Sequence, residues 1–287
     1  MKFFPPIFAL ALLPFFNATA QVTVEATLDQ DQFLPSEAIP VAVRITNHSG
    51  QALHLGADAD WLTFSVESGD GFVVVKHAEV PVQGEFDLGS SEVATKRVNL
   101  TPYFGLSRPG RYHVIATLHI KDWDRDLTSA AKSFDVINGA TIWSQDFGLP
   151  TGGNSPPEAR RYTLEKANYL RSQLRLYVQV SDISETHVFK VSAIGPMVSF
   201  SQPESQLDRF SNLHVLYQSS SAAFTYTVVT PNGEIARQEI YDYLDTHPRL
   251  GADADGNIVV IGGAHRVKPE ELPAVKSPGE MTAPPKP

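Results

Sequence analysis

PGRYHVIATLHIK, residues 109–121, is the stretch that decides the fold. Pro109-Gly110 is a turn signal, and apolar residues then stand at every second position from Tyr112 to Ile120. A period of two is typical of a strand with one face on a core and the other in solvent. The stretch therefore predicts a long, half-buried strand that follows a tight turn.

The same pattern recurs upstream of this strand. Apolar residues alternate with mostly polar ones over 22–28, 41–46 and 62–67, and turn signals occupy 47–50 and 68–71. About seven or eight short strands within roughly 115 residues are typical of two packed antiparallel sheets. We therefore expect a β-sandwich over residues 21–137.

Two stretches of this region resemble bacterial immunoglobulin-like domains. The first runs from Asn99 to Tyr112 and combines Asn-Leu-Thr-Pro-Tyr-Phe with the Pro-Gly turn and a following tyrosine, and the second is Val43 to Gly50 with Asn47 closing a strand. The resemblance implies an immunoglobulin-like sandwich and says almost nothing about function. Protease-inhibitor and macroglobulin-type domains share such turns, but no inhibitory loop motif is present.

The segment after the sandwich combines chain breakers with a helix-start pattern. Residues 147–154 are rich in Gly and Pro, so 138–157 is predicted to be a linker. Ser155, Pro156 and Glu158 resemble a capping box that opens a short helix over 158–173. The spacing of Leu164 and Ala167 fits its apolar stripe, although Tyr162, Leu164 and Tyr169 also fit strands.

Residues 174–265 return to β patterning with an internal repeat. Asp208–Leu216 aligns with Asp253–Ile261 at an offset of 45 residues. The repeat resembles two β-propeller-type blades, and a closed propeller needs about four or more. The two units either pack as a small sandwich or are completed by other chains. The expected fold class is therefore mainly β, with an immunoglobulin-like antiparallel sandwich, a short linking helix and an antiparallel β-repeat domain.

Both ends of the chain carry compositional signals. Residues 1–20 have Lys2, an apolar run and Ala18-Thr19-Ala20, which predicts a cleaved signal peptide and an exported product. Residues 266–287 are rich in proline and predict a disordered tail. The absence of cysteine in an exported chain favours a bacterial periplasmic or extracellular location.

Charge and motif content narrow the function classes. A formal net charge of −9 disfavours binding to nucleic acid, and no later segment is apolar enough for a membrane span. Asp122, Asp124 and Asp126 are weak calcium candidates, but a solvated turn explains their spacing better. We predict no cofactor, no metal and no catalytic set of residues, so the chain is not expected to be an enzyme.

Three function hypotheses remain open. The first is non-enzymatic protein–protein contact in the cell envelope, with another envelope protein or a second copy of the chain as the partner. The contact would use the basic face formed by Arg160, Arg161 and Arg171 and the open sheet edges. The second is carbohydrate binding through exposed aromatic rings, for which the candidates are Trp61, Tyr103, Trp123 and Trp143. The third is a hydrolase or protease inhibitor with an unrecognised site.

Overall fold

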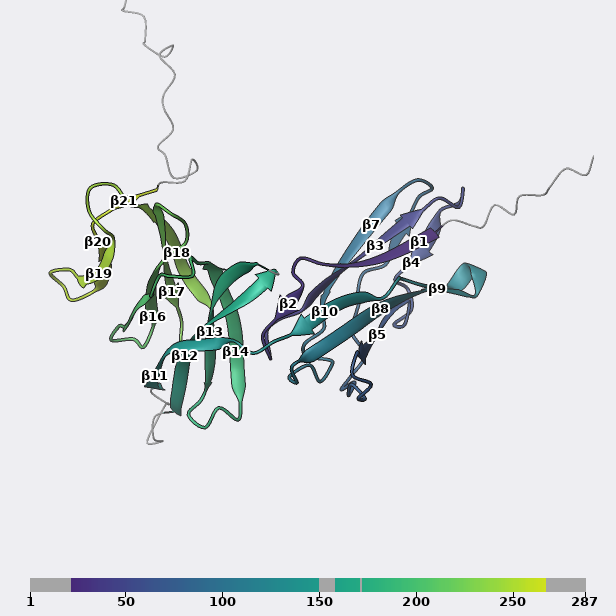
Figure 1. Cartoon of the computed structure of the whole chain (residues 1–287). Coiled ribbons are helices and arrows are strands. Elements are labelled where there is room, and N and C mark those ends of the chain that lie inside the picture. Colours follow the sequence, from purple (N-terminus) through teal and green to yellow (C-terminus); the bar gives the residue numbers. More distant parts are fainter. Residues whose placement is uncertain (1–21, 150–157, 171, 267–287) are drawn as a thin grey trace, which may run out of the picture. The chain divides into compact units, whose positions relative to one another are not determined.

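The computed structural model describes residues 22–149, 158–170 and 172–266. The chain is mainly β, as the sequence predicts, and is built from several antiparallel sheets (Figure 1). It divides into two compact units that interleave along the sequence. Unit 1 contains residues 22–29, 39–105 and 112–133, and unit 2 contains residues 30–38, 106–111 and those from 134 onward. The predicted signal peptide and the tail from residue 267 lie outside the described residues.

Unit 1 consists of short antiparallel ladders with alternating burial. One sheet has the order β1 (Val22–Leu28), β3 (Pro40–Asn47) and β7 (Val93–Asn99). A second ladder places β8 (Gly110–Ile120) between β5 (Leu62–Ser68) and β9 (Arg125–Thr128), and β4 (Leu53–Leu55) pairs with β6 (Phe86–Leu88). The strands predicted from alternation are confirmed.

Burial in unit 1 follows the period of two. On β8 the side chains of Tyr112, Val114, Ala116 and Leu118 are fully buried, while their neighbours are partly exposed. Burying such a face removes apolar area from water, which is the main stabilising contribution to a sandwich core. The ring of Tyr112 packs edge-on against Phe72, with the ring centroids 5.8 Å apart.

Unit 2 contains two larger sheets. Sheet I has the order β11 (Ala140–Leu149), β12 (Glu158–Leu170), β13 (Gln173–Asp182) and β14 (Val188–Pro196). Sheet II has the order β15 (Glu204–Leu207), β16 (Leu213–Gln218), β17 (Ala223–Val229), β18 (Ile235–Asp242) and β21 (Ala264–His265). Strand β2 (Gln32–Phe33) pairs in parallel with β10 (Lys132–Val136), which belongs to the same sheet as β8. Strands β19 (Arg249–Ala252) and β20 (Ile258–Ile261) form a separate two-stranded sheet.

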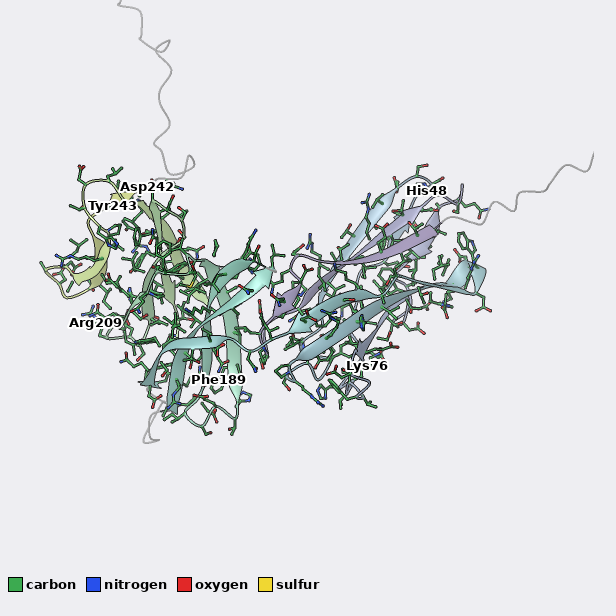
Figure 2. All side chains as sticks on the ribbon, in the orientation of Figure 1. His48, Lys76, Phe189, Arg209, Asp242 and Tyr243 are labelled. Carbon is green, nitrogen blue, oxygen red and sulfur yellow. The ribbon has the colours of Figure 1, made fainter. Side chains whose placement is uncertain are left out.

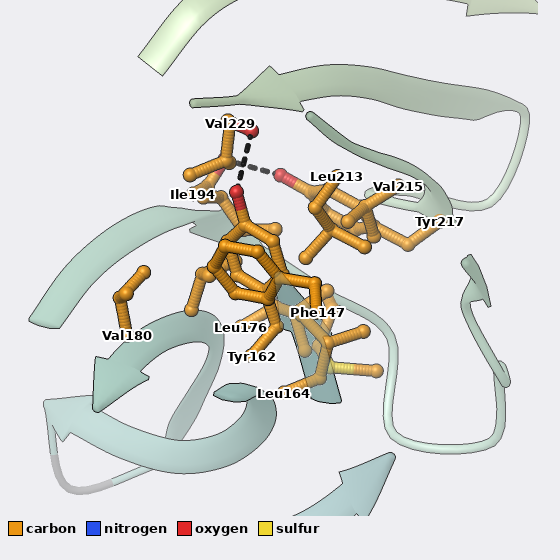
Figure 3. Packing of buried hydrophobic residues seen from close by; sticks show 12 residues of the cluster. Phe147, Tyr162, Leu164, Leu176, Val180, Ile194, Leu213, Val215, Tyr217 and Val229 are labelled. Carbon is orange, nitrogen blue, oxygen red and sulfur yellow. Dashed lines mark hydrogen bonds between the residues drawn. The ribbon is translucent and has the colours of Figure 1, made fainter. Parts of the chain in front are cut away.

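Sheets I and II pack face to face around one apolar core (Figure 3). Sheet I contributes Phe147, whose ring stacks on Tyr162 at 4.3 Å, together with the fully buried Leu164 and Leu176. The hydroxyl of Tyr162 donates to the carbonyl oxygen of Val229 in sheet II at 3.3 Å. Since the buried phenol has a hydrogen-bond partner, the core gains apolar burial without an unpaired polar group there.

The outer faces of both sheets are also covered within unit 2. Leu34, from the segment before β3, packs on Ala167, Tyr177 and Val191 of sheet I. On the other side, the β19–β20 hairpin packs Leu250 and Val260 on sheet II (Figure 1). The unit is therefore a sandwich with additional layers, and two strands of its first sheet, β11 and β12, come from residues before the repeat domain predicted for 174–265.

The predicted helix at 158–173 is wrong, because residues 158–170 form the central strand β12. The apparent helical stripe combines residues from opposite faces of one strand: Leu164 points into the core between the sheets, whereas Ala167 contacts Leu34 on the outer face. Pairing with strands on both sides outweighs a local helical spacing. The predicted linker 138–157 is also corrected, since β11 occupies Ala140–Leu149, and Ser155 and Pro156 lie outside the described residues.

The 45-residue repeat corresponds to a turn and not to a propeller blade. Sheet boundaries fall inside the predicted repeat units, because β13 and β14 belong to sheet I and β15 and β16 to sheet II. What repeats is a five-residue hairpin turn. The carboxylate of Asp208 accepts the backbone N–H of Asn212 at 2.8 Å, and Asp253 accepts that of Asn257 at 2.8 Å. The fourth residue of each turn has a positive φ, 63° at Ser211 and 77° at Gly256.

Candidate functional site

The three aspartates considered for calcium do not converge. Asp122 lies in the short 3-10 helix η1 (Lys121–Trp123), Asp124 follows it with a left-handed backbone, and Asp126 lies on β9. The carboxylate of Asp126 is 2.8 Å from Nδ1 of His119, an interaction that raises the pKa of His119. Within residues 22–149, 158–170 and 172–266, no group of three or more His, Asp or Glu side chains is placed to hold a metal ion.

The arginines predicted to form a basic helix face do not form one. Arg160 and Arg161 are successive residues of strand β12, and each forms ion pairs with acidic residues of unit 2. Arg160 donates to Glu158 at 2.8 Å, and its guanidinium lies 4.2 Å from the ring centre of Phe189. Its side chain is only 12% exposed. Arg161 pairs with Asp146 at 2.6 Å and with Glu185 at 2.7 Å. Because both arginines already have partners, they are poor docking groups. Arg171 lies outside the described residues.

The four candidate aromatic residues have different environments. Trp61 is buried, and its indole N–H donates to the carbonyl oxygen of Val82 at 2.8 Å, so it cannot serve as a platform for sugar stacking. Tyr103 and Trp123, also in unit 1, are half-buried. Trp143 lies on β11 of unit 2, where it packs partly against the core between sheets I and II.

Strand β11 is an open edge of sheet I. It pairs with β12 on one side only, and among the described residues no strand pairs with its outer edge. The opposite edge, β14, has a bridge between Val191 and Glu37, and the carbonyl oxygen of Ile194 accepts a bond from Gln238 at 2.7 Å. In sheet II, β15 is four residues long, and β21 pairs with only two residues of β18, so most of β18 also has no partner strand on that side among the described residues. Near the end of β11 the carbonyl oxygen of Gly148 accepts a hydrogen bond from the hydroxyl of Ser211 at 3.2 Å. Natural proteins shorten or cover their sheet edges, so a ten-residue strand without a second partner strand is a template for pairing with another chain.

A β-bulge shapes the start of this edge. The register with β12 shifts between Thr141 and Trp143, which leaves Ile142 as the extra residue. Bulges bend a strand and re-aim side chains, and here both Ile142 and Trp143 line one cavity.

That cavity has a volume of about 310 Å³ and lies between β11 and the segment that leads into β15. Its walls combine apolar and polar groups: Ile142, Trp143, Leu164, Lys166, Ser201, Gln202 and Pro203. Lys166 makes no ion pair with any described residue and supplies a cation at the wall. We call β11 together with this cavity the β11 site. It offers backbone groups for pairing and a pocket for one side chain.

A second cavity, of about 330 Å³, lies on the outer face of sheet II beside the β19–β20 hairpin. Its floor holds a hydrogen-bonded chain in which Nε2 of His214 is 3.3 Å from the carboxylate of Asp208, and Nδ1 is 2.6 Å from the hydroxyl of Tyr226. Burial raises the pKa of Tyr226. Burial acts to raise the pKa of Asp208 as well, but hydrogen bonds from Asn212 and His214 outweigh it and leave that pKa below its ordinary value.

Neither cavity was predicted as a site. Trp143 was singled out as an aromatic candidate, but its companions come from β12 and from residues 201–203, far along the chain. The two turns that flank the second cavity were visible as the 45-residue repeat, yet the repeat did not indicate that they face one another across a space.

Comparisons with known proteins do not assign the chain to a family. No family model matches it, and no curated protein matches it. Among solved structures it is similar to Spo0M, a sporulation control protein from Bacillus subtilis, with 12% identity over 58% of this chain and 82% of that chain and a TM-score of 0.32. Similarity at this level does not indicate a function. In the part of the chain that the structure describes, no helix has the length and apolarity to span a bilayer.

Proposed function

We propose that this chain is a non-enzymatic, exported bacterial envelope protein that binds another polypeptide. An extended segment of that polypeptide pairs with β11 as an additional strand of sheet I. In this proposal unit 1 is an immunoglobulin-like sandwich, and the β11 site of unit 2 carries the contact. The observation that supports it is the ten-residue open edge, which adjoins a cavity lined by Trp143 and Lys166.

Strand addition explains why an open edge and a pocket lie together. The backbone groups of an incoming extended segment pair with β11 and supply affinity, and alternate side chains enter pockets and supply specificity. The residues of β11 that the partner would approach are mostly small or polar, with Thr141, Ser144 and Gln145 exposed. Asp146 is paired with Arg161, so no uncompensated charge on the strand opposes an approaching backbone.

The test uses two neighbouring proline substitutions, Ser144→Pro and Gln145→Pro. Successive residues of an antiparallel strand direct their N–H groups to opposite edges, so one substitution removes a bond to β12 and the other removes only an outward-facing donor. Thermal melting identifies the variant that keeps the wild-type fold. Tagged protein beginning at Gln21 is then used for quantitative capture from the envelope of the source organism. We expect the well-folded proline variant to lose a partner that the wild type retains in fixed stoichiometry.

Retention of the same partner by that well-folded variant would refute the β11 contact. Light scattering of the purified protein measures its oligomeric state, because a second copy of the chain is one of the possible partners. A dimer that the same variant dissociates supports strand addition between two copies.

Carbohydrate binding is a second candidate function, favoured by the position of Trp143 in the cavity. An indole face together with donors from Lys166 and Gln202 is a suitable lining for one sugar ring. Screening on a glycan array separates the two functions, because Trp143→Ala abolishes glycan binding at this cavity whereas the well-folded proline variant retains it.

A further inference from the structure

The cavity beside the β19–β20 hairpin is bounded by the two copies of the repeated turn. The Asp208–Asn212 turn contributes Asp208, Arg209 and Phe210, and the Asp253–Asn257 turn contributes Gly256 and Asn257. Both turns have the same bonds, with the backbone N–H of Asp208 donating to Asn212 at 3.0 Å and that of Asp253 donating to Asn257 at 2.9 Å. Two turns with equivalent hydrogen bonds therefore both line this space.

The floor of the cavity has its polar groups satisfied internally. If Nε2 of His214 donates to the carboxylate of Asp208, Nδ1 is the acceptor for the hydroxyl of Tyr226. The same hydroxyl lies 3.4 Å from the carbonyl oxygen of Ile258, on the hairpin side. These groups support the walls, and little of their hydrogen-bonding capacity is left for a ligand.

The remaining lining is apolar with cations at the rim. Val228, Ala236 and Ile258 contribute apolar surface, and the ring of Phe210 is 65% exposed. At the rim, the guanidinium of Arg209 lies 4.9 Å from the ring centre of Phe210.

The charges at the rim are unequal. Arg237 forms a close ion pair with Glu239, at 2.7 Å from Nε and 2.5 Å from Nη2. Arg209, labelled in Figure 2, is exposed, and it forms no ion pair with any described residue. The carboxylate of Asp208 also lies in the lining, but its hydrogen bonds go to its own turn and to His214. Of the two arginines in the lining, Arg209 is therefore the one whose guanidinium has no ion pair among the described residues. A carboxylate fits such a guanidinium bidentately.

We propose that this cavity binds a small monocarboxylate with an apolar or aromatic body, and that Arg209 holds the carboxylate. The volume of about 330 Å³ falls at the lower end of the range for small-molecule sites, which suits a ligand of about ten non-hydrogen atoms. This binding is independent of strand addition at β11, because the two cavities share no residue.

The test titrates the full chain with benzoate and follows backbone amide resonances by NMR. We expect saturable shifts at residues 208–212 and 256–258, with a dissociation constant on the order of 1 mM for so small a probe. Benzamide, which has the same shape without the charge, should bind about tenfold more weakly, and Arg209→Gln should weaken benzoate binding by about the same factor.

The matched control is Arg125→Gln, since Arg125 is also an exposed arginine and lies in unit 1. It should leave benzoate binding unchanged. The proposal is overturned if benzoate causes no saturable shift at these two turns, if benzamide binds equally well, or if Arg209→Gln and Arg125→Gln have the same effect.

Discussion

Replacing Asn47 should destabilise unit 1 more than any other single polar substitution at the end of β3. The side chain is fully buried. Its amide nitrogen donates to the carbonyl oxygens of Gln51 at 2.7 Å and Leu88 at 2.9 Å, with Gly89 also within 3.2 Å. Its amide oxygen accepts the backbone N–H of Ser49 at 2.9 Å. One side chain thus joins the end of β3 to two separate loops.

The magnitude follows from these bonds. Asn47→Ala removes two donated bonds, one of them to the buried carbonyl group of Leu88, and at least one accepted bond, each with a net contribution of about 1 kcal/mol. We expect a loss of roughly 2–4 kcal/mol in the free energy of unfolding, which corresponds to about 10–20 °C in Tm for a unit of this size. Asn47→Asp should be worse at neutral pH, because it places a carboxylate among carbonyl oxygens.

Differential scanning calorimetry at pH 7 and pH 4 measures both effects. The control is His48→Ala, because His48 is the next residue and its side chain is exposed (Figure 2). We expect its Tm to stay near that of the wild type. The reasoning fails if Asn47→Ala melts as His48→Ala does, or if Asn47→Asp is the more stable of the two Asn47 variants at pH 7.

Two further predictions concern titration and packing. The hydrogen bond with Asp87 raises the pKa of His54 above its ordinary value of 6.5. The stabilising contribution of protonated His54 is therefore fully present below pH 6.5 and is lost as the pH rises through the raised pKa. NMR titration of His54 should show the raised midpoint, and Asp87→Asn should lower it. Gly195→Ala would place a Cβ 2.5 Å from the hydroxyl oxygen of the buried Tyr217, at a residue whose φ is 137°. It should lower the free energy of unfolding by about 1–3 kcal/mol more than Gly71→Ala, whose new Cβ meets nothing within 4 Å. Equal losses in Tm for the two variants would contradict this prediction.

The sequence predicted strands well where the alternation of apolar and polar residues matches the alternation of buried and exposed side chains. The strands at β1, β3, β5 and β8 have one buried face, so their apolar residues recur with a period of two. Strand β12 is buried on both faces near Leu164 and Ala167, so its apolar residues follow no simple alternation, and a helical spacing emerged by coincidence. Its true neighbours are set by pairing with β11 and β13, which a local pattern does not encode.

The candidate site was only partly predictable, for a related reason. Open sheet edges were expected, but which strand is an edge depends on sheet order, and the sheet order differs from the predicted blade repeat. Arg161 looked like a docking residue because its acidic partners, Asp146 and Glu185, are distant in sequence. The partner of Arg160, Glu158, is only two residues away, but a predicted helix does not indicate that the two side chains pair. The bulge that aims Trp143 into its cavity also has no local signature in the sequence.

Hydrogen–deuterium exchange along β11 in the isolated protein tests the open edge most directly. The outward-facing amides of the stretch around Ser144 and Gln145 should exchange rapidly at low protein concentration, while those paired with β12 remain protected. Addition of the captured partner, or a rise in concentration if the partner is a second copy, should protect the outward amides. Full protection of both sets at every concentration would show that the edge is already covered and would contradict strand addition at β11.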